Sequence, residues 1–315
     1  MKTIPLIFLV VMLQAACQAQ GERIGQFDNV VGIEGRKAPV NEADSEKRVA
    51  SRNEALPRDS LRTENPKVNP HGIDQNLPMA NQWVLYTIQQ LPTGGGYSVS
   101  LKALNGLKQG VRMDATGKVL EVNPRVALPS FCSSATYIVL AKVTSELVKR
   151  NVEVSPAALK KMARIGLPDG VGVWGRWNAN GPGTARLFAE LNCGENFTSY
   201  EKALPGDFMK IWWTEEIGSK ESGHSVVFLG NEKKDGVDMV RFWSSNIPDG
   251  YGEQLIKRSK VKRVLFSRLV DIRKLSGIEQ LSGKDEFLAD MLKRPADWKE
   301  IVRRCAVKDE PRGKK

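Results

Sequence analysis

Two residues of this chain, a cysteine and a histidine, stand where thiol chemistry needs them. Cys132 follows Pro129-Ser130-Phe131 and opens a long apolar pattern with helical spacing. The N–H groups and dipole of a helix N-terminus favour an anion, so they lower the pKa of a thiol placed there. His224 opens a buried, apolar strand pattern, and a neighbouring imidazole can take the proton of such a thiol. The pair predicts a nucleophilic thiolate with a histidine base.

The choice of base follows from the histidine count. The chain has two histidines, His71 and His224, and His71 lies in a segment poor in large apolar side chains. Cysteine is also a common small core residue, and a lone histidine is often a satisfied polar core residue. The order of the two residues, with Cys132 at a helix start and His224 at a strand start, favours catalysis.

A third group should fix the histidine tautomer by accepting its other ring N–H. Residues 237–243 predict a strand that pairs with residues 224–229 across a polar turn. If Val226 faces Phe242, His224 faces Ser244, and Asn246 is the next residue on that side. A slip of one residue would bring Trp243 and Ser245 there instead. We expect Asn246 to orient the histidine, with Ser244 as the alternative.

Substrate contacts are expected close to the cysteine. Ser133 follows it, and small residues at this point would let a substrate approach. Residues 166–183 hold too many glycines for a regular element, and Trp174 and Trp177 in such a loop can line a cleft or close the edge of the core. The loop lacks the Gly-Lys-Ser/Thr ending of a phosphate-binding loop, which excludes nucleotide binding of that kind.

The elements around these residues can be placed from periodicity and turn signals. We expect the main helix over residues 130–150, with Ser130 as its N-cap and an apolar stripe facing the core. Further helices are expected at 79–91, 98–107 and 184–192, a hairpin at 111–122, and a strand after the turn at 205–207.

These segments resemble the papain-like superfamily, and specifically its bacterial NlpC-type cell-wall peptidases and amidases. The matching parts are Ser130–Ser133 at a helix start, Pro205–Phe208 opening a strand, Gly223–Val227 opening the next, and a polar residue one strand later. The resemblance covers about residues 76–270. It implies an α+β fold in which the nucleophile helix packs on an antiparallel sheet. The helices expected over residues 284–304 are not standard parts of the family, and they predict a helical C-terminal extension.

The resemblance also implies the chemistry. Cys132 would attack an amide and form a thioester, His224 would act as base, and Asn246 would orient it, with no cofactor or metal. Enzymes of this kind often carry a Gln or Tyr shortly before the nucleophile to bind the oxyanion, and residues 125–129 offer neither. The backbone N–H of Cys132 can serve, and the second donor stays open.

Domain organisation follows from composition. Residues 1–20 carry one positive charge at Lys2, an apolar run from Ile4 to Leu13 and small residues thereafter, which predicts an export signal and a secreted or periplasmic protein. Cys17 as a lipidated first residue is the alternative, and it would be the one membrane attachment. Residues 21–75 predict a disordered linker, residues 76–275 the catalytic domain and residues 276–315 a basic helical extension.

Removal of the signal with Cys17 leaves Cys132, Cys193 and Cys305. An odd number of cysteines in an oxidising compartment implies one free thiol. With Cys132 as that thiol, we expect a disulfide between Cys193 and Cys305. The cysteine spacings do not resemble a zinc site.

The net charge of +11 favours an anionic partner. We expect peptidoglycan or another anionic cell-wall polymer, and no nucleic acid, because basic and aromatic residues do not alternate as in single-strand binders. The predicted function is cleavage of an amide or peptide bond, with peptidoglycan as the expected substrate. The alternatives are an acyltransferase or deamidase that acts on a protein with the same nucleophile, or a catalytically silent wall-binding protein of this fold.

Overall fold

The structure, a computed structural model, describes residues 72–309. The expected export signal with Cys17, nearly all of the expected linker, His71 and the end of the basic tail lie outside the described residues. Within residues 72–309, no helix has the length and apolarity needed to cross a membrane.

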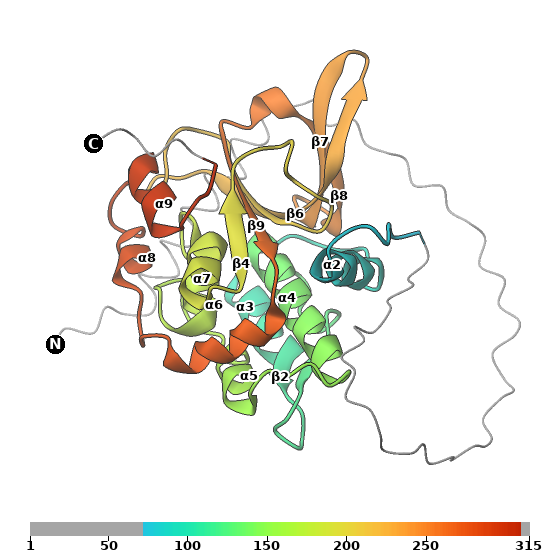
Figure 1. Cartoon of the computed structure of the whole chain (residues 1–315), viewed down its shortest axis with the longest axis vertical. Coiled ribbons are helices and arrows are strands. Elements are labelled where there is room, and N and C mark those ends of the chain that lie inside the picture. The colour runs from blue at the N-terminus through green and yellow to red at the C-terminus, as the bar shows by residue number, and fades with distance from the viewer. Residues whose placement is uncertain (1–71, 310–315) are drawn as a thin grey trace, which may run out of the picture.

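A seven-stranded antiparallel sheet organises the molecule, with the order β1-β8-β7-β6-β5-β9-β4 (Figure 1). Successive side chains of a strand point to opposite faces, and both faces of this sheet are buried. On β5, for example, Phe208 packs on the face that carries the main helix, while Met209 and Ile211 pack on the other face. The strands are β1 (Gly94–Gly95), β4 (Gly194–Phe197), β5 (Phe208–Trp212), β6 (Gly223–Lys234), β7 (Val237–Asn246), β8 (Gly250–Lys257) and β9 (Arg263–Leu269).

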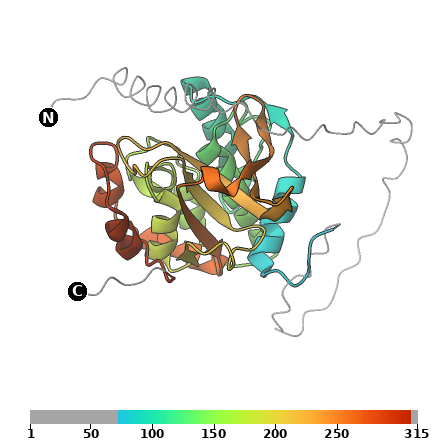
Figure 2. The ribbon, with the colours of Figure 1, turned by 90° about the horizontal axis from the view of Figure 1, so that it is seen from above.

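Helix α4 (Cys132–Val148) is the expected nucleophile helix, and it packs on β6 and β7. Its apolar stripe, including Val139 and Val143, is fully buried. Helix α2 (Met79–Gln89) packs beside α4, and in both views it lies on the opposite side of the molecule from the C-terminal helices (Figures 1 and 2). The other helices are α3 (Leu101–Gly110), α5 (Pro156–Met162), α6 (Gly172–Trp177), α7 (Gly183–Leu191), α8 (Glu286–Asp290) and α9 (Trp298–Arg304), with 3-10 helices η1 (Arg258–Lys260) and η2 (Ile272–Gln280).

The coarse fold class is therefore confirmed: the chain is α+β, with helices packed on an antiparallel sheet. The hairpin at 111–122 is present as β2 (Val111–Met113) and β3 (Leu120–Val122). One expectation was wrong, because the glycine-rich segment at 166–183 contains a helix, α6. Its glycines serve close packing, since a Cβ at Gly183 would lie 2.2 Å from the carbonyl oxygen of Arg176.

The turn before β5 is held by a buried carboxylate. Asp207 is fully buried and accepts hydrogen bonds from both Nε and Nη2 of Arg268, at 2.8 and 2.7 Å. It also accepts from Asn81 Nδ2 at 2.8 Å and from the backbone N–H of Leu204 at 2.8 Å. A buried ion pair is stable only when its remaining groups are satisfied, as they are here. This network fixes the point from which β5 runs toward the site.

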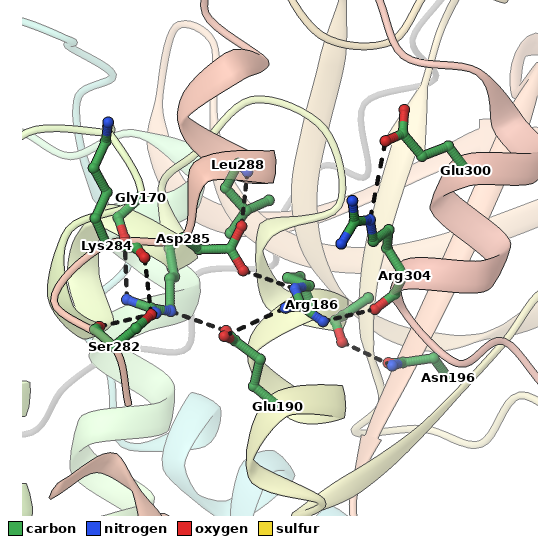
Figure 3. Close-up of polar contacts among 12 residues, drawn as sticks. Gly170, Arg186, Glu190, Asn196, Ser282, Lys284, Asp285, Leu288, Glu300 and Arg304 are labelled. Atoms are coloured by element: carbon green, nitrogen blue, oxygen red, sulfur yellow. Dashed lines mark hydrogen bonds and ion pairs between the residues drawn. The ribbon is translucent and has the colours of Figure 1, made fainter. Parts of the chain in front are cut away.

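The segment after residue 275 packs into the same body as the rest of the chain. Helix η2 runs across the expected boundary, and side chains of α8 and α9 share an apolar cluster with Trp212 and Leu265 of the sheet. Figure 3 shows the polar side of this packing, where Arg186 donates from Nε to Asp285 at 2.8 Å and from Nη1 to the carbonyl of Arg304 at 3.0 Å. The basic helices are thus tied to α7 rather than extending from the domain.

Candidate active site

Cys132 is the first residue of α4, and its side chain is half-buried. Phe131 takes the N-cap position in an extended conformation, and no side chain among the described residues caps this end. The expected Ser130 cap was wrong, because the Ser130 hydroxyl donates to the carbonyl of Phe131 at 3.4 Å. The N-terminal N–H groups of α4 are therefore not occupied by a side-chain cap, and they and the helix dipole favour an anion at the cysteine.

His224 is the second residue of β6, and aromatic rings restrict its plane. The Trp213 ring stacks on it with centroids 6.4 Å apart, and the Phe242 ring meets it edge-on at 5.7 Å. Its Nε2 lies 3.0 Å from Oδ1 of Asn246, the last residue of β7. The imidazole is thus held by Trp213, which directly follows β5, by Phe242 of β7 and by the Asn246 oxygen.

Asn246 is oriented by a second hydrogen bond. Its amide nitrogen donates to the carbonyl of Gly252 at 2.8 Å, so its amide oxygen is the atom that faces the histidine. An amide oxygen only accepts, so Nε2 of His224 must carry the ring proton. Nδ1 is then the basic nitrogen, and this tautomer is the one that can take a proton from a thiol. The structure therefore brings His224 together with the expected orienting residue.

Ser244 does not take that role. Its hydroxyl is fully buried and donates to the carbonyl of Ser225 at 2.7 Å. The assumed register was off by two residues: Phe228, not Val226, pairs with Phe242. The pairing is irregular between Phe228 and Gly230. On the other side of this irregularity, Val227 pairs with Trp243, and the same register continued toward the start of β6 places His224 opposite Asn246. A shift of two residues keeps each side chain on its face, which is why the expected face was right.

The environment of the Cys132 thiol favours ionisation. Burial alone would raise the pKa of the thiol, but a hydrogen bond with His224, the charge of His224, the backbone N–H of Ser225 and the charge of Lys210 outweigh it. Together they lower the pKa of Cys132 from 9.0 to about 7. The imidazole is thus the neighbour that lowers the pKa of the thiol most, which is what a base does for its nucleophile.

Trp174 and Trp177 are both core residues, and Trp177 in addition borders a small hollow. Trp174 is fully buried and donates from Nε1 to the carbonyl of Gly166 at 3.1 Å. Trp177 is 2% exposed and donates from Nε1 to the carbonyl of Ser133 at 3.1 Å. Both rings pack edge-on against Tyr137 of α4. These rings fill the core behind the nucleophile helix, as the second of the two expectations has it, and Trp177 also forms part of the wall of a small hollow.

Ser133 is buried as well, and its hydroxyl donates to Oδ1 of Asn178. With its carbonyl bonded to Trp177, this residue ties α4 to the end of α6. Its side chain is therefore engaged inside the protein, and the expected contact of Ser133 with substrate has no support from its hydroxyl. The residue positions the first turn of the nucleophile helix.

A small hollow lies near the thiol, with a cavity volume of about 10 Å³, which is room for one water molecule. Its wall contains Ser225 and Lys210, the two residues that act on the Cys132 thiol together with His224. The opposite wall is the connection from α6 to α7, at residues 179–185. A hollow of this size is far smaller than a ligand pocket, so it does not by itself mark where a substrate binds.

The expected disulfide is not formed. Cys193 and Cys305 are both free and fully buried, and they lie in two different apolar clusters. Burial raises the pKa of Cys193 to about 12 and also raises the pKa of Cys305. Both are buried core thiols, and Cys132 is the candidate nucleophile that remains among the cysteines of residues 72–309.

Lys210 and its partner Glu221 were not identified from the sequence. Lys210 stands between apolar neighbours in the middle of β5, and this interruption of a buried strand pattern was the signal that could have singled it out. In residues 72–309, no group of His, Cys, Asp and Glu side chains is arranged to hold a metal ion. Comparison of the chain with models of protein families, with characterised proteins and with solved structures finds no match.

Proposed function

We propose that this protein is an exported cysteine hydrolase with a papain-like, NlpC-type site that cleaves an amide bond in peptidoglycan. The observation that carries the proposal is the arrangement of Cys132 at the start of α4 beside His224, whose Nε2 lies 3.0 Å from an Asn246 oxygen fixed by its own hydrogen bond. That arrangement supplies a nucleophile, a base and an orienting group in the order that thiol catalysis requires.

The reaction would proceed in two steps. The Cys132 thiolate attacks the amide carbonyl carbon, and a carbon–sulfur bond forms while the carbonyl oxygen becomes an oxyanion. The His224 imidazolium gives its proton to the leaving nitrogen, the carbon–nitrogen bond breaks, and a thioester remains on Cys132. A water molecule, deprotonated by His224, then attacks the thioester, and the acid and the thiolate separate.

Asn246 would keep His224 in one tautomer through both steps. The backbone N–H of Cys132, in the same turn of α4 as the sulfur, would donate to the oxyanion of the attacked carbonyl. The hydrogen bond to the oxyanion is stronger in the transition state, where the negative charge develops, than in the bound substrate. This difference in binding is what accelerates the reaction.

Peptidoglycan is supported by the export signal expected at residues 1–20 and by the net charge of +11. Some of that charge is carried by the connection from β8 to β9, where Lys257 and Lys262 are exposed. An anionic polymer is attracted to such a surface without a specific pocket. Lipidation at Cys17 would keep the enzyme near a membrane, and cleavage of the signal would release it.

The test is digestion of purified peptidoglycan in water labelled with oxygen-18. Hydrolysis predicts soluble peptides with a new amine and one labelled oxygen in the new carboxyl group, and the Cys132→Ala protein should release none. If an added amine is incorporated instead, without label, the protein is an acyltransferase. If peptidoglycan is bound but neither product forms, it is a wall-binding protein, and the proposal is wrong.

A further inference from the structure

Lys210 lies in the middle of the sheet, and its Nζ comes within 3.1 Å of where a Cβ would stand on Gly223, the residue before His224. In the pairing of β5 with β6 it stands opposite Ser225, and the next pair joins Ile211 to His224. Phe208 and Trp212, at even spacing on the same strand, pack on the side of the sheet that carries the helices, so Lys210 points to that side. Its side chain is 16% exposed, and it lines the hollow beside the thiol.

Glu221 holds the ammonium in place. Its Oε1 accepts from Lys210 Nζ at 2.7 Å, and the Glu221 side chain is 5% exposed. Its Oε2 accepts from the backbone N–H of Gly181 at 2.6 Å, from the N–H of Gly218 at 3.0 Å and from Trp212 Nε1 at 3.1 Å. Four donors fix this carboxylate, so it in turn fixes the position of the lysine charge.

The pair therefore connects three parts of the site. Gly181 belongs to the wall of the hollow, Trp212 to the end of β5, and Lys210 to the neighbourhood of the sulfur. If the pair only stabilised the loop, a neutral donor and acceptor would suffice. A cation near a sulfur that must become an anion has an electrostatic consequence in addition, because the lysine side chain is largely shielded from solvent.

We propose that the Lys210–Glu221 ion pair is a positioning device that sets how strongly the protein stabilises the Cys132 thiolate. Lys210 supplies a fixed positive charge beside the sulfur, and Glu221 limits that charge by neutralising part of it. The inference rests on Cys132 being the nucleophile of the proposed function. The groups that act on the thiol in the described structure are His224, Lys210 and the Ser225 N–H, and Glu221 acts through Lys210.

The two members of the pair must then act in opposite directions. Lys210→Met keeps the length of the side chain and removes its charge, so the pKa of Cys132 should rise by about half a unit to one unit. Lys210→Arg keeps the charge and should restore most of the wild-type value. Glu221→Gln keeps an acceptor for the Gly181 and Gly218 N–H groups but leaves the lysine unneutralised, so the pKa should fall.

The measurement is the rate of iodoacetamide alkylation of Cys132 in the full-length protein as a function of pH, followed by intact mass. Lys142→Met is the matched control, because it removes a lysine from α4 itself, beyond the first turns and paired with Glu146. It should leave the midpoint unchanged. Thermal melting of each variant shows whether it is folded, so that a change in the pKa of Cys132 is not confused with unfolding. If Lys210→Met does not fold, the comparison of Glu221→Gln with Lys210→Arg tests whether the charge of the pair sets the pKa.

An unchanged midpoint in folded Lys210→Met, or shifts of the same direction in Lys210→Met and Glu221→Gln, would show that the pair only supports the loop. Alkylation needs no substrate, so this result is separate from the fate of the proposed function. Opposite shifts in a protein that hydrolyses no peptidoglycan would leave the tuning of the thiol standing. Hydrolysis of peptidoglycan by a protein whose alkylation midpoint does not shift in the variants would refute the role of the ion pair and leave the proposed function intact.

Discussion

Replacement of His224 by alanine should change the acidity of the Cys132 thiol more than any other single substitution. The two largest effects that lower this pKa, a hydrogen bond and a charge, both come from His224, while burial of the sulfur acts in the opposite direction. Without the imidazole, burial would be opposed only by the Ser225 N–H and Lys210. The pKa should therefore rise from about 7 to its ordinary value of 9.0 or above.

The size of the effect follows from the thiolate fraction. At pH 6 a thiol with a pKa near 7 is about one-tenth ionised, and one with a pKa near 9 is about one-thousandth ionised. A thiolate whose thiol has a higher pKa is the better nucleophile, with a Brønsted slope of about 0.4–0.5. A rise of two pKa units therefore makes each thiolate roughly ten times more reactive and offsets part of the lower thiolate fraction. Alkylation of His224→Ala at pH 6 should therefore be about ten-fold slower than that of the wild type, or slower still.

The assay is iodoacetamide alkylation between pH 5 and pH 10, followed by intact mass and peptide mapping. The Cys132→Ala protein measures background from the buried Cys193 and Cys305, which should react little while the protein is folded. The midpoint for the wild type should lie near 7, and the midpoint for His224→Ala near 9 or higher. Coincident profiles for the two proteins would refute direct interaction between the thiol and the imidazole.

Three further outcomes are expected. Asn246→Ala should lower the rate of amide hydrolysis by about ten- to one hundred-fold, because the ring loses its orientation, whereas Ser244→Ala should change it little; equal losses in a steady-state assay would contradict the assignment. Asp207→Ala should destabilise the protein by about 2–4 kcal/mol in urea unfolding, because it removes the buried carboxylate that accepts from Arg268, Asn81 and Leu204, and a loss below about 1 kcal/mol would show that the network is not needed. Cys193 and Cys305 should both be free thiols that react only after denaturation; a disulfide between them in peptide mapping would overturn their assignment to separate clusters.

The positions of the reactive residues were predictable because they depend on local pattern. Residues such as Ala135, Val139 and Val143 repeat at helical spacing, so the start of α4 and the place of Cys132 follow from the sequence. Alternation along β6 and β7 places His224 and Asn246 on one face. The register was not predictable, since the expected and the observed pairing of β6 with β7 differ by two residues, which leaves the apolar faces unchanged.

Features that depend on packing between distant segments were not predictable. A glycine-rich segment suggests a loop, but close approach of α6 and α7 requires glycine there and buries Trp174 and Trp177. An odd number of cysteines suggests a disulfide, but it carries no information on the distance between two sulfurs. Lys210 acquires its role only when β5 pairs with β6, and its partner Glu221 comes from the connection between these strands.

The most direct test of the mechanism is whether Cys132 carries the acyl group during turnover. Peptidoglycan peptides are incubated with the full-length protein in the presence of hydroxylamine, which converts a thioester into a hydroxamate. The proposed chemistry predicts hydroxamate formed at the expense of the free acid, together with an acid-quenched adduct on the peptide that contains Cys132. Release of the free acid at the wild-type rate by the Cys132→Ala protein would contradict it.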